Sequence, residues 1–169
     1  MITTSIISKL KLHQNIFIGH FAGLSTQEYL WKPHPEHWCL LEIICHLYDS
    51  EVDDFRFRLQ FCLENPDKTP PPIFPVEWVK DRKYIEQDFA VMTSKFIRAR
   101  KASINYLKKL ENADWSKGYV HSEFGRISAH FLLENWLAHD LLHIRQITRL
   151  KYLYLKEHSE EPIEYAGNW

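Results

Sequence analysis

The sequence predicts an all-α fold, a four-helix bundle within a single domain that spans residues 1–169. Four long segments repeat apolar residues at intervals of three and four, the spacing that gathers them on one face of a helix. Only 5 glycines are present and they are scattered, which argues against a sheet-rich fold with many tight turns. Four amphipathic helices with two longer connections are typical of a bundle, and no fixed-period repeat indicates a helical solenoid.

The first two helices are separated by a polar connection. The first helix is expected over about residues 4–24, with Leu10, Phe17 and Phe21 on its apolar stripe. Residues 32–37 contain two prolines, and the residue before a proline is biased away from the helical conformation. The second helix is therefore expected to begin near Trp38 and to reach about Glu64, again with one apolar face.

The second half of the chain supplies the other two helices. Prolines at positions 66 and 70–72 predict an extended loop, followed by a short helix or turn at about residues 76–82. The third helix is expected over about residues 88–111, and the loop at 112–126 contains a strand-like piece at 118–120. Ser128 is a suitable N-cap for a fourth helix that continues to about Leu155. The aromatic end of the irregular tail at 162–169 is expected to dock onto the bundle.

Composition and charge exclude several classes of function. Lys+Arg number 21 and Asp+Glu 22, and the basic cluster at residues 98–101 is interpreted as a solvated helix face, so we expect no nucleic-acid partner. No glycine-rich phosphate loop of the usual patterns occurs. The chain has neither a signal-peptide pattern nor a run of 18 apolar residues, so no membrane partner is expected. The 3 cysteines form no C-x-x-C unit, which indicates reduced, buried thiols and a cytoplasmic protein.

Three histidines form the candidate metal site. His139 and His143 lie four residues apart in a segment with helical spacing, so both imidazoles project from one face of the fourth helix. His46 lies far upstream, at the edge of the apolar face of the second helix. Three neutral imidazoles without a fourth protein ligand are typical of an open, catalytic metal site. Spacing alone leaves a second interpretation open, in which these are ordinary helix histidines bonded to backbone carbonyls or to solvent.

Helical geometry identifies two candidate neighbours of this site. Glu42 lies one turn before His46 on the same face, so it either orients that imidazole or simply occupies the favourable first turn of its helix. Gln146 lies within about 20° of His139 around the helix axis and can bond a metal ligand or a substrate. Beyond these two candidates, no catalytic side chain is assigned.

Three further histidines are weaker candidates. His130 is nine residues before His139, which places it about 180° away around the helix axis. His13 and His20 share the inner face of the first helix and could line a cavity there. For both of them, a hydrogen-bonded histidine of the core or of its boundary is the better interpretation.

The chain resembles the DinB-like superfamily, in order and spacing, over essentially its whole length. Residues 38–51 are similar to the second-helix signature of that family, in which a Trp-Ser start is followed by Glu and then by His-Leu and an acidic residue. Cys39 stands where the family usually has Ser or Thr as a helix cap. Residues 23–33 resemble the connection between the first two helices of the family, and residues 139–146 match the remaining half of its metal motif.

The resemblance implies a fold and a chemistry. The fold would be an up-down-down-up four-helix bundle with a long crossover connection, often assembled as a homodimer. His46, His139 and His143 would bind a divalent metal ion, commonly zinc or nickel. Several family members are transferases that use bacillithiol, mycothiol or glutathione, so we expect a metal-dependent thiol S-transferase that acts on a small electrophile. A metal-dependent hydrolase and a non-catalytic, stress-related binding module remain alternatives, because an open site can activate either a thiol or a water molecule.

Overall fold

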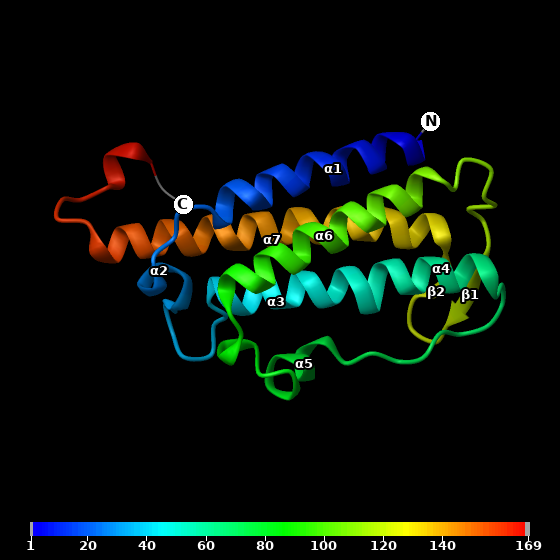
Figure 1. Ribbon diagram of the computed structural model, residues 1–169, viewed down its shortest axis with the longest axis horizontal. Helices are drawn as coiled ribbons and strands as arrows, with labels where there is room; N and C mark the ends of the chain where they lie inside the picture. Colours follow the sequence, from blue (N-terminus) through cyan, green and yellow to red (C-terminus); the bar gives the residue numbers. More distant parts are fainter. Residues whose placement is uncertain (1, 168–169) are drawn as a thin grey trace.

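Four long helices lie side by side in the computed structural model, which describes residues 2–167 (Figure 1). They are α1 (Ile2–Phe21), the joined pair α3 (Leu40–Asp49) and α4 (Arg56–Glu64), α6 (Phe89–Lys108) and α7 (Ala129–His158). α1 and α7 run in one direction, whereas α3–α4 and α6 run in the other (Figure 1). The long connection from α4 to α6 returns along the bundle, so the expected up-down-down-up topology is confirmed.

Shorter elements fill the connections between the long helices. They are α2 (Thr26–Leu30), α5 (Pro75–Asp81), the 3-10 turns η2 (Tyr84–Glu86) and η3 (Glu164–Ala166), and the strands β1 (Gly118–His121) and β2 (Gly125–Ser128). α5 agrees with the short helix predicted in the crossover connection, and β1 agrees with the predicted strand-like piece. α2 and β2 were not predicted, because each is too short to show a periodic apolar pattern.

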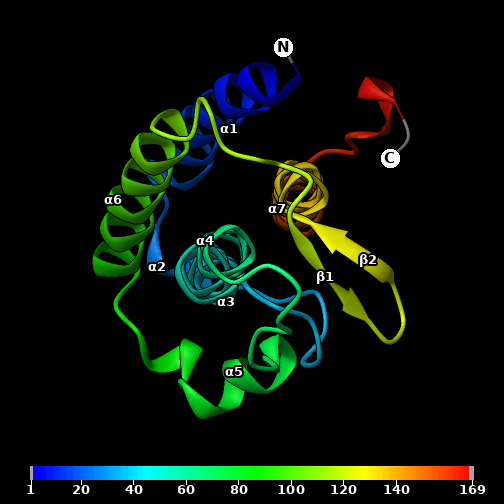
Figure 2. The ribbon, with the colours of Figure 1, turned by 90° about the vertical axis from the view of Figure 1, so that its right-hand side faces the viewer.

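The two strands form an antiparallel hairpin beside the start of α7 (Figure 2). Gly118 pairs with Ser128, and a Cβ atom at position 118 would lie 2.1 Å from the backbone oxygen of Ile127. Only glycine therefore fits this end of the hairpin. The hairpin delivers Ser128 to the start of α7, where its side chain accepts a hydrogen bond from the backbone N–H of Phe131. The predicted N-cap of the fourth helix is thus confirmed.

The second long helix contains a π-helical segment that the sequence did not predict. The predicted continuous helix at residues 38–64 begins instead at Leu40, and Ser50–Phe55 (η1) adopts π geometry between α3 and α4. A π turn adds one residue to a helical turn and so changes which side chains face inward beyond it. Such segments are frequent at functional sites. This one begins four residues after His46.

The interior of the bundle consists of two apolar clusters with a polar layer between them. One cluster is built around Phe17, Phe21 and Phe96, and the other around Leu10 and Trp136. Five buried polar side chains make up most of the layer between the clusters: His13, His46, Glu51, Arg100 and Asp140. The two apolar clusters shield this layer from the two ends of the bundle, and all of the candidate chemistry lies in it.

Three smaller expectations were tested by the fold. Cys39, Cys45 and Cys62 are free and buried, as predicted. Within residues 2–167, no helix combines the length and the apolar character needed to cross a membrane. In the tail, Tyr165 is fully exposed instead of docked on the bundle, and the expected docking of Trp169 falls outside the described residues.

Candidate metal centre

The three histidines predicted from the sequence converge in the polar layer. The Nε2 atom of His139 lies 3.2 Å from Nε2 of His46 and 3.1 Å from Nε2 of His143. His46, His139 and His143 thus form a group of three potential metal ligands, and among the described residues their ligand atoms are close enough together to share one metal ion. The packing of α3 against α7 therefore brings His46 to a pair that lies 93 residues further along the chain.

Aromatic rings hold the imidazoles in place. The ring of Trp38 lies with its centroid 5.0 Å from that of His46, and the ring of Phe55 lies 5.0 Å from that of His139. Ser50, the first residue of the π segment, has its Oγ atom 3.3 Å from Nε2 of His46. Because Ser50 and Phe55 are the two ends of η1, the π segment contributes a contact to two of the three histidines.

Burial keeps the three imidazoles neutral. Burial and the neighbouring His143 lower the pKa of His46 to about 3. Burial, together with the two other histidines, lowers the pKa of His139 to about 2. Burial also lowers the pKa of His143 below its ordinary value. Since a metal ion binds the neutral form of imidazole, the cluster is ready to act as a ligand set at neutral pH.

The spacing of the nitrogen atoms fits a tetrahedral metal ion. With metal–nitrogen bonds of about 2.0–2.1 Å, two ligands of a tetrahedron lie about 3.3–3.4 Å apart. The observed separations of 3.1 and 3.2 Å between Nε2 atoms are close to that value. A single proton can bridge two facing nitrogen atoms, but it cannot serve three of them. The donor set therefore fits a divalent ion that would keep a position open to water or a substrate.

Gln146 lies where the sequence analysis placed it, beside a predicted ligand. Its side-chain oxygen is 2.8 Å from Nδ1 of His143. A hydrogen bond from Nδ1–H to this oxygen fixes the tautomer in which Nε2 carries the free lone pair. By contrast, Nδ1 of His46 is buried and has no hydrogen-bond partner among residues 2–167. His46 is therefore held by packing against Trp38, whereas His143 is held by a hydrogen bond.

Glu42 has a structural role in the arrangement observed. One carboxylate oxygen accepts a hydrogen bond of 2.8 Å from the backbone N–H of Cys39, the N-cap residue of α3. The same carboxylate forms an ion pair of 2.7 Å with Lys32. These contacts correspond to the second of the two interpretations that the sequence allowed, a glutamate that stabilises the first turn of its helix.

A buried ionic network, which sequence reasoning missed, lies beside the histidine cluster. The guanidinium group of Arg100 donates two hydrogen bonds to Asp140, of 2.6 and 2.8 Å. It also pairs with Glu51 at 2.8 Å. His13 Nδ1 lies 3.2 Å from Asp140, and Trp136 Nε1 donates to Glu51 at 3.1 Å. The network thus connects α1, α6 and α7 with η1, the π segment that joins α3 to α4.

The interpretation of residues 98–101 as a solvated face was wrong for Arg100, which is 1 % exposed. The signal that could have identified it is its phase: Arg100 lies four residues after Phe96 and four before Ile104, both of which are buried. A charged residue on the apolar stripe of a helix must find a buried partner of opposite charge. Asp140, the partner of Arg100, is the residue next to His139. The network therefore also fixes the position of His139, a candidate metal ligand.

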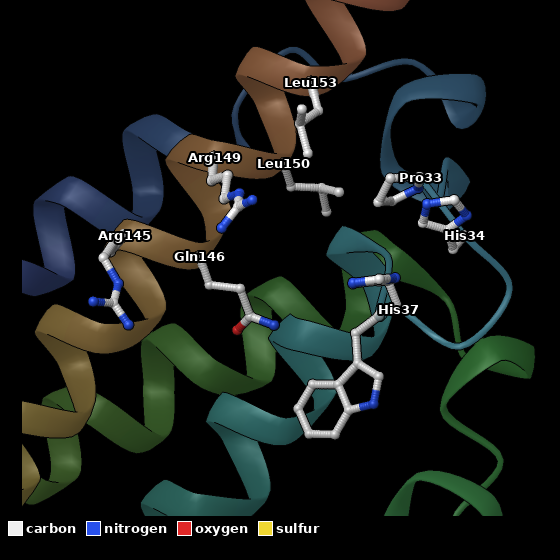
Figure 3. Close-up of a pocket in the computed structure, with 9 residues that line it drawn as sticks. Pro33, His34, His37, Arg145, Gln146, Arg149, Leu150 and Leu153 are labelled. Carbon is white, nitrogen blue, oxygen red and sulfur yellow. The ribbon is translucent and has the colours of Figure 1, made fainter. Parts of the chain in front are cut away.

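A pocket of about 810 Å³ opens beside the cluster (Figure 3). Its walls are the connection at residues 33–38 and one face of α7 between Arg145 and Leu153. Two of its lining residues contact the histidines directly: Gln146 bonds to His143, and Trp38 packs on His46. His46 is buried, and His139 and His143 are half-buried. A small molecule in the pocket would therefore lie next to the metal position.

The three weaker histidine candidates lie apart from the cluster. His130 is near Glu134, with its Nε2 atom 3.8 Å from the carboxylate, on the face of α7 that the helical phase predicted. His13 belongs to the ionic network, as a hydrogen-bonded core histidine. His20 is half-buried, and its backbone oxygen accepts a hydrogen bond from Lys151.

Comparison with known proteins agrees with this fold. Residues 9–147 match the sequence profile of the DinB superfamily, and the chain therefore belongs to that superfamily. Its structure is similar to that of YfiT from Bacillus subtilis, described as a probable metal-dependent hydrolase with an unusual four-helix bundle topology. The TM-score is 0.79 at 16% sequence identity, and the match covers 90% of this chain and 87% of that chain. At this identity the likeness shows a shared fold. The search of curated proteins found no match.

Proposed function

We propose that this member of the DinB superfamily is an enzyme in which His46, His139 and His143 bind a divalent metal ion. We further propose that it transfers a low-molecular-weight thiol to a small electrophile. The observation that carries the proposal is the convergence of three neutral imidazole nitrogen atoms behind Gln146 and Trp38, two residues that line a pocket. A divalent ion bound there would supply the positive charge that stabilises the deprotonated form of a thiol or of water.

The thiol must come from outside the protein. Burial raises the pKa of Cys39 to about 11 and that of Cys45 to about 12. Cys62 is buried as well, and burial raises its pKa above the ordinary value. Because the thiolate is the nucleophilic form, none of these side chains can attack an electrophile at neutral pH. A soluble thiol that enters the pocket is the nucleophile that fits this site.

The charges around the site favour thiol transfer over hydrolysis. Attack by water requires a general base within hydrogen-bond reach of the reacting proton. Glu42 is paired with Lys32, and both Glu51 and Asp140 are paired with Arg100. Each of these carboxylates is therefore bonded to a cation, and Glu51 and Asp140 share one. A thiol, whose ordinary pKa of about 8.5 is far below that of water, needs less help from a base than water does.

Metal-dependent hydrolysis is the second candidate. It is supported by the fold similarity to YfiT, which is described as a probable metal-dependent hydrolase. It is also compatible with the open coordination position, which water can occupy as readily as sulfur. The two candidates use the same three ligands and differ in what occupies the open position.

Several finer features belong to the same proposal. Zinc or nickel is the expected ion, on the basis of the ligand type. We propose a cytoplasmic protein of one domain that assembles as a homodimer. Neighbouring apolar side chains on α7, Leu141 and Leu142, are each more than half exposed and support an association surface.

Cobalt and nickel substitution tests the proposal directly. The purified protein is freed of metal, loaded with Co²⁺ or Ni²⁺, and titrated with glutathione, cysteine and 2-mercaptoethanol. We expect one metal ion per chain and a sulfur-to-metal charge-transfer band that grows with thiol concentration. His143→Ala should lose both signals, while His130→Ala, which changes a histidine on the opposite face of the same helix, should keep both.

Each other outcome selects an alternative. A stoichiometric metal ion without a charge-transfer band for any thiol, combined with hydrolysis of model esters, would establish the hydrolase. A wild-type protein that binds no divalent ion would refute the metal centre and leave a non-catalytic binding module.

A further inference from the structure

The pocket beside the histidines carries an excess of positive charge. Arg145 and Arg149 lie one turn apart on α7, and both line the pocket. His34 and His37 line it from the opposite wall. No aspartate or glutamate is among the described residues that line it. Glu36 lies in the same connection but does not contribute to the pocket surface.

The two arginines have no partner of their own. Within residues 2–167, neither Arg145 nor Arg149 forms a salt bridge or a hydrogen bond with another group. Both arginines are exposed, whereas Arg58, which pairs with Asp54, and Arg100, which pairs with Asp140, lie at buried or half-buried positions. Like charges one turn apart on a helix repel each other, and an anion placed between them relieves that repulsion. The geometry thus leaves two guanidinium forks available for an oxyanion.

The two arginines lie beside the pocket residue that contacts the histidine cluster. Figure 3 shows the Arg149 side chain turned toward the space between α7 and His37, with Arg145 at its edge. Gln146 lies between these arginines along α7 and bonds to His143. The cationic wall of the pocket therefore adjoins the histidine cluster through Gln146.

We propose that the pocket binds an acidic small molecule, whose carboxylate or phosphate group is held by Arg145 and Arg149 while its reactive group reaches the three histidines. This inference rests on the proposed function for the reactive end of the pocket. It adds the substrate class: the molecule carries an oxyanion at a distance from the reacting atom. The volume of about 810 Å³ accommodates a molecule of the size of a tripeptide thiol.

The oxyanion can belong to the thiol or to the electrophile, and paired probes distinguish the two sources. Glutathione and its diethyl ester differ in carboxylate charge and keep the thiol. Succinate and dimethyl succinate differ in the same way and have no thiol. Binding of each probe to the metal-free protein is measured by isothermal titration calorimetry, with the protein at constant ionic strength. An acid that binds while its ester does not identifies the group that the arginines recognise.

The double variant Arg145→Gln/Arg149→Gln tests the assigned residues. We expect it to bind the preferred acid at least tenfold more weakly than the wild type. Arg98→Gln/Lys101→Gln removes the same charge from exposed positions on α6, outside the pocket, and should change the affinity less than twofold. Equal binding of acid and ester, no binding of any acid at millimolar concentration, or unchanged affinity in the double variant would each overturn the proposal.

Metal content separates this inference from the proposed function. The double variant should retain the full metal stoichiometry, because neither arginine contacts the histidines in the described structure. His139→Ala should lose metal and still bind the acid. A wild-type protein that binds no metal but discriminates acid from ester would refute the metal centre alone and leave the oxyanion site in place.

Discussion

The polar layer of the bundle contains two groups of polar side chains, the ionic network and the histidine cluster, whose polar atoms meet different kinds of partner. In the ionic network, the single cation of Arg100 is bonded directly to two carboxylates, those of Glu51 and Asp140, by short hydrogen bonds. In the histidine cluster, three groups of the same kind face each other, with nitrogen atoms 3.1 and 3.2 Å apart. The network finds its partners within the chain, whereas the cluster presents three lone pairs to a common point.

This difference separates a framework from a binding site. A buried charge without a partner is strongly unfavourable, so we expect the ion pairs of Arg100 with Glu51 and Asp140 to be needed for the bundle to fold. A histidine has a smaller burial cost, because burial lowers its pKa and the imidazole is then buried in its neutral form. The cluster can therefore remain available for a ligand, while the adjacent network holds α1, η1, α6 and α7 together. Four changes test this division of roles.

The largest effect is expected from removing the charge at the centre of the network. Arg100→Met leaves Glu51 and Asp140 buried without their cation, and we expect the free energy of unfolding to fall by about 3–5 kcal/mol. Urea denaturation of the metal-free protein measures this loss. Arg98→Met, at an exposed position two residues earlier, should change stability by less than about 0.5 kcal/mol. A loss below about 1 kcal/mol for Arg100→Met would contradict a stabilising role of these buried ion pairs.

Removing one histidine from the cluster and one from the ionic network tests which of the two regions binds the metal ion. His139→Ala should weaken zinc binding by about a hundredfold or more, since structural zinc sites of four ligands contribute about 10–16 kcal/mol in total. His13→Ala, which removes a buried histidine of the network, should leave zinc affinity within a few-fold of wild type. Competition with a chromophoric chelator gives both affinities. Equal losses in the two variants would show that the histidines act through the fold and not as ligands.

A smaller effect on metal affinity is expected from changing Gln146, whose side chain bonds to the Nδ1 atom of His143. Gln146→Leu removes the acceptor for Nδ1 of His143, and metal affinity should fall about 10- to 100-fold. Asn135→Leu makes the same chemical change on α7, at an exposed amide whose bond is to the backbone oxygen of Phe131. That variant should bind metal as the wild type does. If Gln146→Leu also leaves the affinity unchanged, the hydrogen bond has no part in orienting His143.

The smallest effect is a dependence of stability on pH. In the folded, metal-free protein, the pKa values of His46 and His139 are about 3 and about 2. In the unfolded chain, histidine takes up protons near pH 6.5, so acidification favours unfolding. From pH 7 to pH 6, each of these histidines should lower the free energy of unfolding by about 0.7 kcal/mol. Urea denaturation at both pH values should show a shallower loss in His46→Gln, and an equal or steeper loss would count against the assigned burial effect.

Much of the fold followed from the sequence, because helix formation depends on local patterns. The apolar spacing located the four long helices, and Ser128 marked the first residue before α7. The π segment at Ser50–Phe55 and the short α2 helix escaped prediction, since neither has a periodic signature of its own. The boundary of the second helix moved from Trp38 to Leu40 for a related reason: Glu42 bonds to the backbone of Cys39 and fixes the start of α3 there.

The three histidines that converge in the candidate site were identified from the sequence, whereas their surroundings were not. His139 and His143 share a helix face by spacing alone, and the family resemblance selected His46 as their partner. The role of Glu42 could not be assigned from the sequence. Whether it orients His46 or stabilises the first turn of its helix depends on the position of Lys32 in the folded chain. The charge pairing of Arg100 was likewise invisible, since its partners Glu51 and Asp140 are 49 and 40 residues away along the chain.

The sequence by itself determined which faces of the helices are apolar and which side chains can bind a metal ion, because both follow from residue type and helical period. Only the tertiary structure decided which polar groups are satisfied by one another and which remain available. Arg100 met two carboxylates when α6 packed beside η1 and α7, whereas Arg145 and Arg149 met none in the described chain. Pairing over long sequence distances depends on packing geometry, and that geometry is a property of the assembled bundle.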